Sequence, residues 1–221
     1  MKLLVFTRYP EAGAVKTRLA GALGDAGAAD LHRAMTEHTL RRLRRLQART
    51  EVWFCGGTEG AMRAWLGDEL NYRVQGPGDL GDRLCAALRY SFERGEDKVV
   101  VVGADCPDLR ADHVEEAVQL LDHHPVVLGP AADGGYYLLA LRAFHGDLFR
   151  SIPWGTDRVR IETSLRAEGL GLEVGYLEDL SDVDRPEDLP HWYRVFAPGR
   201  ASCGSPGSPV ARRGGRRFAR E

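Results

Sequence analysis

The feature that most constrains the fold is an alternation of short apolar runs with amphipathic segments along most of the chain. The clearest apolar run is residues 98–103, KVVVVG, which reads as a strand covered on both faces, because such strands are apolar at every position. Runs of the same kind predict six further strands, at residues 2–7, 51–55, 72–75, 125–128, 136–141 and 172–176.

Helical periodicity fills most of the gaps between these strands, at residues 28–46, 61–66, 80–93, 112–121, 158–168 and 186–195. Strands that alternate with helices predict an α/β fold, a three-layer sandwich in which helices cover both faces of a mostly parallel sheet. Only the stretch around residues 133–141 departs from this rhythm.

Composition predicts one globular domain, residues 1–196, followed by a disordered basic tail, residues 197–221. The tail is rich in Gly, Ser and Pro and holds six arginines, whereas the whole chain of 221 residues has a net charge of −2. An acidic body argues against nucleic-acid binding. No apolar stretch is long enough to cross a membrane, and the four cysteines show no CxxC pairing, so we expect a cytoplasmic protein.

The loop after the first strand is a candidate phosphate site. It carries Lys16 and Arg18 at the expected start of a helix, where exposed amides and cations together attract phosphate. A solvated basic turn is the alternative. The motifs GxxxxGK[ST] and GxGxxG are both absent, which argues against a P-loop ATPase and a standard dehydrogenase.

Two acidic loops are candidate metal sites. Asp105 follows the strongest strand and Asp108 comes three residues later, while Asp182 and Asp184 precede a helix that opens with proline. Carboxylates at the end of a strand can hold a divalent cation that bridges diphosphate oxygens. The alternative is that these side chains only cap turns and helices.

A third loop places Asp133 before paired glycines and an aromatic residue, Tyr136. Paired glycines let the backbone approach a ligand closely, and an aromatic ring can stack on a sugar or base. A hairpin turn would need no ligand. Asp79 and Asp157 lie in further polar loops, and Asp79 could contact a nucleotide. The histidines form no metal pair and are interpreted as structural.

Six motifs in order resemble a bacterial family of provisional glycosyltransferases, first described as a domain of unknown function and often labelled arsenosugar-biosynthesis-type. They are VKTRLA, GDLGDRL, GADCPDL, GPAADGGYYLLAL, WGTDRV and DVDRPEDL. The resemblance covers roughly residues 1–195. It implies the glycosyltransferase A-type, nucleotide-diphospho-sugar transferase fold, with a more distant likeness to phospholactate and molybdenum cofactor guanylyltransferases.

The resemblance also implies roles for individual residues. The nucleotide would bind to Thr7, Arg8, Lys16, Arg18 and Asp79. Mg²⁺ or Mn²⁺ would bind to Asp105, with Asp184 as the second ligand by its position in the last motif. That motif commonly has Thr where this chain has Arg185, and Asp105-Cys-Pro-Asp108 is not the strict DxD of many sugar transferases, so the role of Asp108 stays open.

The leading prediction is metal-dependent transfer of a sugar from a nucleotide diphosphate sugar to a small acceptor. Asp133 is the candidate general base. The pocket for the sugar or the acceptor would be lined by Gly134, Gly135, Tyr136 and Trp154. The first alternative is a nucleotidyltransferase that joins a nucleotide from its triphosphate to a phosphorylated acceptor and releases diphosphate. The second is a nucleotide-binding protein without catalysis.

Overall fold

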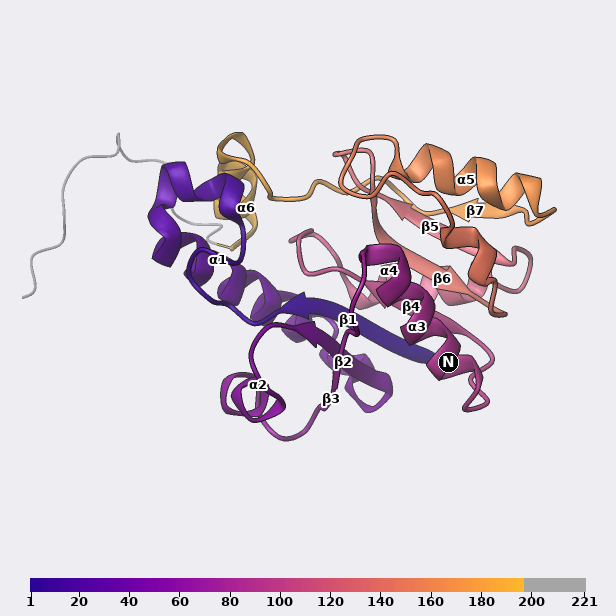
Figure 1. Ribbon diagram of the computed structural model, residues 1–221, viewed down its shortest axis with the longest axis horizontal. Coiled ribbons are helices and arrows are strands. Elements are labelled where there is room, and N and C mark those ends of the chain that lie inside the picture. Colours follow the sequence, from indigo (N-terminus) through magenta and orange to yellow (C-terminus); the bar gives the residue numbers. More distant parts are fainter. Residues whose placement is uncertain (197–221) are drawn as a thin grey trace, which may run out of the picture.

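The computed structural model describes residues 1–196, so the predicted tail, residues 197–221, lies outside the described residues. One sheet of seven strands has the order β3-β2-β1-β4-β6-β5-β7 (Figure 1). The strands are β1 (Lys2–Arg8), β2 (Thr50–Cys55), β3 (Asn71–Val74), β4 (Val99–Val102), β5 (Val126–Pro130), β6 (Tyr136–Leu141) and β7 (Val174–Tyr176). Each predicted strand overlaps one of these.

The sheet is mostly parallel, as predicted, and β6 is the exception. β6 pairs antiparallel with β4 and β5, whereas the pairs β1–β2, β1–β4, β2–β3 and β5–β7 are parallel. The connection from β5 to β6 is too short for a helical crossover, so β6 has to run back. Its first residues therefore lie at the edge of the sheet where β1 and β4 end, and Gly103 N donates to Tyr137 O at 3.1 Å.

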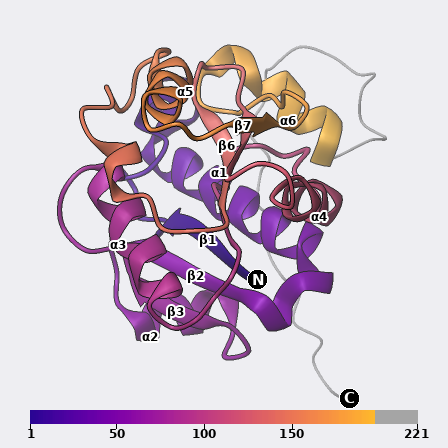
Figure 2. The ribbon, with the colours of Figure 1, turned by 90° about the vertical axis from the view of Figure 1, so that its right-hand side faces the viewer.

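Helices cover both faces of the sheet, which confirms the three-layer α/β prediction. Figure 2 shows α3 and α4 on opposite sides of the sheet. The α-helices are α1 (Ala20–Arg42), α2 (Glu59–Leu66), α3 (Leu80–Phe92), α4 (Ala111–Leu120), α5 (Val159–Gly169) and α6 (Leu189–Phe196). Short 3₁₀ helices are η1 (Thr17–Leu19), η2 (Arg44–Arg49), η3 (Gly146–Phe149) and η4 (Pro186–Asp188).

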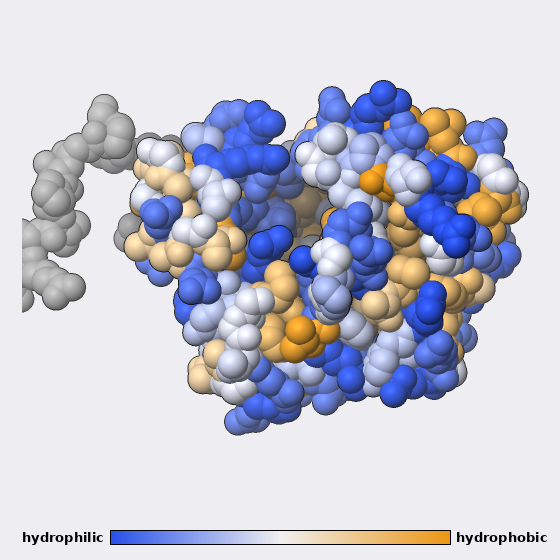
Figure 3. Space-filling view, viewed as in Figure 1, coloured by the Kyte–Doolittle hydropathy of each residue, from blue (hydrophilic) through white to orange (hydrophobic). Residues whose placement is uncertain are grey.

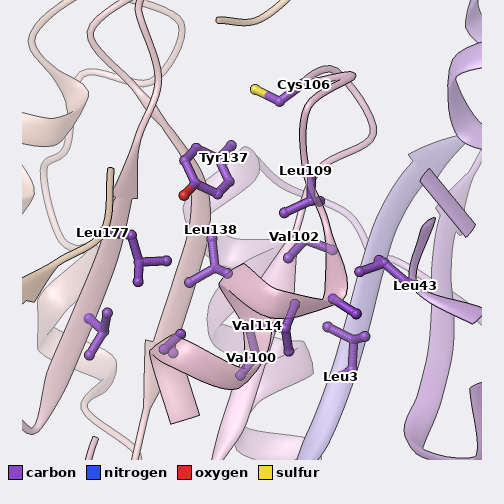
Figure 4. Packing of buried hydrophobic residues seen from close by; sticks show 14 of the residues in the cluster. Leu3, Leu43, Val100, Val102, Cys106, Leu109, Val114, Tyr137, Leu138 and Leu177 are labelled. Carbon is purple, nitrogen blue, oxygen red and sulfur yellow. The ribbon is translucent and has the colours of Figure 1, made fainter. Parts of the chain in front are cut away.

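The four valines of β4 show why this strand is apolar throughout. Val100 and Val102 belong to the core on the α4 side, together with Val114 and Leu138 (Figure 4). Val99 and Val101 belong to the core on the α3 and α5 side. Because successive side chains of a strand point to opposite faces, both layers draw on this one strand. The loop that follows β4 is thus anchored from both sides.

Helix α1 begins earlier and ends earlier than the predicted range 28–46. It starts at Ala20, and Gly24 interrupts it with φ 70° and ψ 164°. Its first residues are mostly Ala and Gly, which leave no apolar periodicity to detect. After Arg42 the chain continues as η2 rather than as α-helix.

The C-terminal segment returns across the carboxyl edge of the sheet before it ends as α6. Val183 N donates to Asp105 O at 2.9 Å, which fastens this segment to the loop after β4. Helix α6 then lies beside α1 (Figure 1), where buried Trp192 joins a cluster with Leu19, Leu31 and Met35. The two acidic loops predicted from the sequence therefore meet at one edge of the sheet.

Candidate functional site

A cleft of about 730 Å³ opens at the carboxyl ends of β1 and β4. Figure 3 shows it as a hollow between the surface over α6 and the surface over α5. Open α/β sheets bind ligands at this edge. The walls include these predicted site residues: Thr7, Arg8, Lys16, Arg18, Asp79, Asp105, Asp133, Gly135, Tyr136, Trp154 and Asp184.

Lys16 is the central charge of this cleft. Its Nζ lies 2.6 Å from Asp105 Oδ1 and 3.4 Å from Asp184 Oδ1, and it donates to Val183 O at 2.7 Å. These three partners match the three protons of an ammonium group. Only 4% of the Lys16 side chain is exposed, and its backbone is left-handed at φ 47°, a strained conformation for a residue with a side chain. The fold therefore holds this cation in one place.

The charges around Lys16 keep each other ionised. Burial favours loss of the Lys16 proton, but the carboxylates of Asp105 and Asp184 outweigh burial and raise the pKa of Lys16. Desolvation opposes ionisation of Asp105, and Lys16 outweighs that effect and lowers the pKa of the Asp105 carboxyl. About half of the Asp105 side chain, 52%, remains exposed, so it stays open to a ligand.

Arg18 adds a second cation at the mouth of the cleft. Its Nη1 lies 2.6 Å from Asp184 Oδ2, while 55% of its side chain is exposed. Arg8 also lines the cleft, from the end of β1, and is exposed. Exposed guanidinium groups can turn onto phosphate oxygens and bind them through two donors. Arg8, Lys16 and Arg18 together make this end of the cleft basic.

His32 is a cleft residue that the sequence interpretation left out of the site, because its only signal was a histidine on a long helix without a partner at metal-binding spacing. Its Nε2 donates to Arg8 O at 3.1 Å and lies 3.3 Å from Thr7 Oγ1. Burial lowers the pKa of His32, with Asp105 opposing in part. A neutral imidazole thus fixes the backbone of Arg8 and the hydroxyl of Thr7, both predicted to bind nucleotide.

Asp79 lines the cleft but is also occupied as a helix cap. Its side chain accepts from Asp82 N at 2.9 Å, and the Asp82 side chain accepts from Asp79 N at 3.1 Å, which forms a capping box at the start of α3. One oxygen of Asp79 is therefore used locally.

The turn before β6 forms the other side of the cleft. Asp133 Oδ1 accepts from Gly135 N at 2.8 Å, which closes an Asx-type turn. Tyr136 and Trp154 meet edge to face with ring centroids 6.4 Å apart. Gly81 of α3 packs against Trp154, since a Cβ at residue 81 would lie 2.6 Å from the indole Nε1. The Asp, the paired glycines and the aromatic residues of this sequence pattern thus form a tightly packed wall of the cleft.

Gly134 and Asp108 lie outside the residues that form the cleft walls. Gly134 has φ +89°, and a Cβ added there would lie 2.1 Å from Asp157 O. Asp108 Oδ2 instead lies 2.7 Å from His191 Nε2 of α6. The positive φ and the close packing against Asp157 therefore favour glycine at residue 134.

Replacing Gly134 with alanine is expected to lower the free energy of unfolding by about 2 to 4 kcal/mol, because a positive φ and a backbone collision combine. Gly67→Ala is the matched control, since Gly67 has φ +90° and no atom within 4 Å of its Cβ position. Chemical denaturation of the two variants measures the difference. Equal losses would show that the contact with Asp157 carries no strain.

Asp182 is a second residue of the cleft wall that was left out of the predicted site set. Desolvation, followed by the nearby Asp133 carboxylate, raises the pKa of Asp182 to about 6. Near neutral pH this carboxylate is therefore ionised against opposition from its surroundings. Only the fold brings it close to Asp133, because the two lie in different loops.

Asp182→Asn is expected to stabilise the protein by about 1 kcal/mol at pH 7.5, a figure reduced for the partial exposure of the group. Because the pKa of Asp182 is raised in the folded state, ionisation of this carboxyl destabilises the fold as pH rises through about 6. The stability gained by Asp182→Asn should therefore shrink as pH falls from about 6 to about 4, where the carboxyl is protonated. Denaturation curves across this range test it, with Asp30→Asn, an exposed site on α1, as control. A gain that is independent of pH would contradict the assignment.

The structure places the two predicted metal ligands on the same partner. Asp105 and Asp184 both contact Lys16, and within residues 1–196 no group of three or more His, Cys, Asp or Glu side chains is arranged to hold a metal ion.

Cys55, Cys85 and Cys106 are free thiols. None of the helices in this part of the chain combines the length and apolar character needed to cross a membrane.

Comparison with known proteins gives a family and several relatives. Residues 39–156 match the family described as an uncharacterized protein conserved in bacteria, DUF2064. The 3-phospho-D-glycerate guanylyltransferase of Phenylobacterium zucineum (strain HLK1) is 34% identical over 179 residues, 78% of this chain and 81% of the relative. The 2-phospho-L-lactate guanylyltransferase of Methanocaldococcus vulcanius is 28% identical over 76 residues, 34% of each chain.

A solved structure agrees with the fold over nearly the whole chain. It is the crystal structure of a Desulfovibrio desulfuricans G20 protein whose provisional name is nucleotide-diphospho-sugar transferase. It has a TM-score of 0.83 and 36% identity, and it covers 90% of this chain and 90% of its own. The predicted nucleotide-diphospho-sugar transferase-like fold is confirmed.

These comparisons confirm a transferase and correct the leading prediction. The curated relatives named above are guanylyltransferases, so the prediction of sugar transfer from a nucleotide sugar is wrong. The names of these relatives do not mention arsenosugars. The error has a physical reason. Sugar transfer and nucleotidyl transfer both need loops that bind the phosphates of a nucleotide, and the motifs indicate such loops without indicating which bond of the nucleotide is broken.

Proposed function

Starting from the fact that this chain belongs to the DUF2064 family, we propose that it is a nucleotidyltransferase. In the proposed reaction a nucleotide passes from GTP to a phosphorylated small molecule, and diphosphate is released. The guanine base and the phosphorylated acceptor follow the names of the curated relatives.

The observation that carries this proposal is the meeting of Lys16, Arg18, Asp105 and Asp184 in the cleft. Nucleotidyl transfer concentrates negative charge on a triphosphate, so catalysis depends on fixed positive charge and on precise positioning. A buried ammonium group with three partners is such a fixed charge. The exposed guanidinium groups of Arg8 and Arg18 supply cations that can close on the β- and γ-phosphates.

The chemistry needs no general base. An oxygen of the acceptor's phosphate attacks the α-phosphorus of GTP, and the bond from that phosphorus to the bridging oxygen of the β-phosphate breaks. The acceptor phosphate is already ionised at neutral pH, so no proton has to be removed. We therefore assign Asp133 to orienting the acceptor, next to Tyr136 and Trp154, and not to proton transfer.

The donor atoms in the cleft suit Mg²⁺ or Mn²⁺. Asp105 and Asp184 offer carboxylate oxygens, and Mg²⁺ is usually bound by one or two carboxylates together with substrate phosphates. A divalent ion held there would neutralise charge on the triphosphate as diphosphate leaves. Lys16 and Arg18 already balance these two carboxylates, so we expect the ion to bind together with the nucleotide.

We further propose that residues 1–196 form the catalytic domain and that the protein acts in the cytoplasm. The residues described above as cleft walls all lie within this range.

The direct test measures diphosphate release by the full chain from GTP and Mg²⁺, with 3-phospho-D-glycerate or 2-phospho-L-lactate as acceptor. We expect release that requires both acceptor and divalent ion. ATP, CTP and UTP test the base, and a nucleotide sugar is the control donor, from which we expect no nucleoside diphosphate. A chain that binds GTP but releases no diphosphate with either acceptor would contradict the proposal.

A further inference from the structure

Asp108 and His191 lie outside the cleft walls, yet they touch each other directly behind the loop that carries Asp105. His191 Nε2 is a buried ring nitrogen with no hydrogen bond of good geometry among the described residues, and it lies at ion-pair distance, 2.7 Å, from Asp108 Oδ2. The Asp108 side chain is 38% exposed and that of His191 is 22% exposed. The sequence left the role of Asp108 open between a metal site and a turn cap, and His191 was interpreted as structural with the other histidines.

Besides the bridge through Lys16, the loop of Asp105 and the segment of Asp184 are joined directly at two points among the described residues. At one point Val183 N donates to Asp105 O at 2.9 Å. At the other, His191 meets Asp108. The loop from Asp105 to Asp108 is thus held at both ends by the same returning segment of the chain.

Helix α1 supports this arrangement from behind. His38 Nε2 donates to Pro107 O at 2.9 Å, and the His38 ring packs edge to face on Trp192 with centroids 5.7 Å apart. Trp192 in turn stacks on Phe196 at 4.7 Å. Helix α6 is therefore packed firmly against α1, and its residue His191 reaches Asp108.

We propose that Asp108 and His191 are a positioning pair, which sets the distance between Asp105 and Asp184. The inference rests on the proposed function, since these two carboxylates are its assigned metal ligands. The contact of Asp105 with Lys16 depends on the loop staying in place, because the pair and the Val183 bond tie the loop directly to the Asp184 segment that Lys16 also contacts. Neither member of the pair touches substrate, so both act through Asp105.

The test compares Asp108→Asn, His191→Gln and the double variant in the full chain. We expect Mn²⁺ to bind the GTP complex about three- to tenfold more weakly, measured by electron paramagnetic resonance of free Mn²⁺. Binding of GTP without metal should change less than about twofold. The double variant should resemble the single variants, because each change removes the same contact.

Asp112→Asn is the matched control. Asp112 lies just past this loop and pairs with Arg45 on the surface. Its substitution therefore removes a nearby carboxylate but leaves the contact between Asp108 and His191 in place. The exchanged variant Asp108→His with His191→Asp restores a facing pair and should recover most of the Mn²⁺ affinity.

Mn²⁺ affinities within twofold of the Asp112→Asn control would overturn the proposal, as would losses that add in the double variant. If the single variants do not fold, failure of the exchanged variant to restore either folding or Mn²⁺ affinity overturns it as well. A wild-type chain that does not bind Mn²⁺ with GTP would contradict the proposed function instead, so the two failures are distinguishable.

Discussion

Replacing Lys16 with methionine is expected to reduce kcat by about 100-fold or more, the loss that follows removal of one fixed charge at a transition state. Methionine keeps the length of the side chain, so the change removes charge rather than volume. The same variant should lose about 2 kcal/mol of unfolding free energy. Losing one member of a buried ion pair costs more than this, and the exposure of Asp105 reduces the penalty.

The pH dependence of this stability loss has a definite sign. Lys16 lowers the pKa of Asp105, so their pairing stabilises the fold above the unfolded pKa of the carboxyl. That contribution disappears as pH falls through the lower folded pKa. Wild type and Lys16→Met should therefore differ most near neutral pH and converge in acid.

Lys98→Met is a matched control for Lys16→Met. Lys98 Nζ also donates to a backbone carbonyl, Val118 O at 2.9 Å, and to a carboxylate, Asp122 Oδ1 at 2.5 Å, but at the far end of β4 from the cleft. Steady-state diphosphate release and urea denaturation should show a small stability loss and normal kcat for this control. A Lys16→Met enzyme within tenfold of wild type would contradict the central role of Lys16.

Asp105→Asn is expected to reduce metal-dependent diphosphate release by about 1,000-fold while the fold is kept. The amide has the shape of the carboxylate but lacks the charge that holds a divalent ion next to the phosphates. Lys16 retains Asp184 and Val183 O as partners, so we expect an unfolding free energy within about 2 kcal/mol of wild type.

A thermal-shift series separates the role of Asp105 in metal binding from its role in nucleotide binding. GTP alone should stabilise wild type and Asp105→Asn equally, whereas the additional shift with Mn²⁺ should vanish in the variant. Asp122→Asn, which loses the partner of Lys98, should behave as wild type in both. A Mn²⁺ shift that survives in Asp105→Asn would exclude this residue as a metal ligand.

The loops that form the cleft could be found from the sequence because each follows or precedes a strongly apolar strand. The order of charges along the chain also marked Lys16, Asp105 and Asp184 individually. Their pairing could not be read, since Lys16 and Asp184 are 168 positions apart and meet only because the chain returns across the sheet. The proximity of Asp182 to Asp133 could not be read for the same reason, because the two residues lie in different loops.

The sequence by itself determined the α/β class, the seven strands and the loops that line the cleft, because hydrophobic periodicity and turn residues act over a few positions. It also marked the stretch around residues 133–141 as a departure from the strand–helix alternation, and the structure shows that β6 runs antiparallel there. Only the tertiary structure decided that Lys16 bridges Asp105 and Asp184 and that His191 meets Asp108. Those contacts depend on the strand order and on how α6 packs against α1, and both are set by packing between segments far apart in the chain.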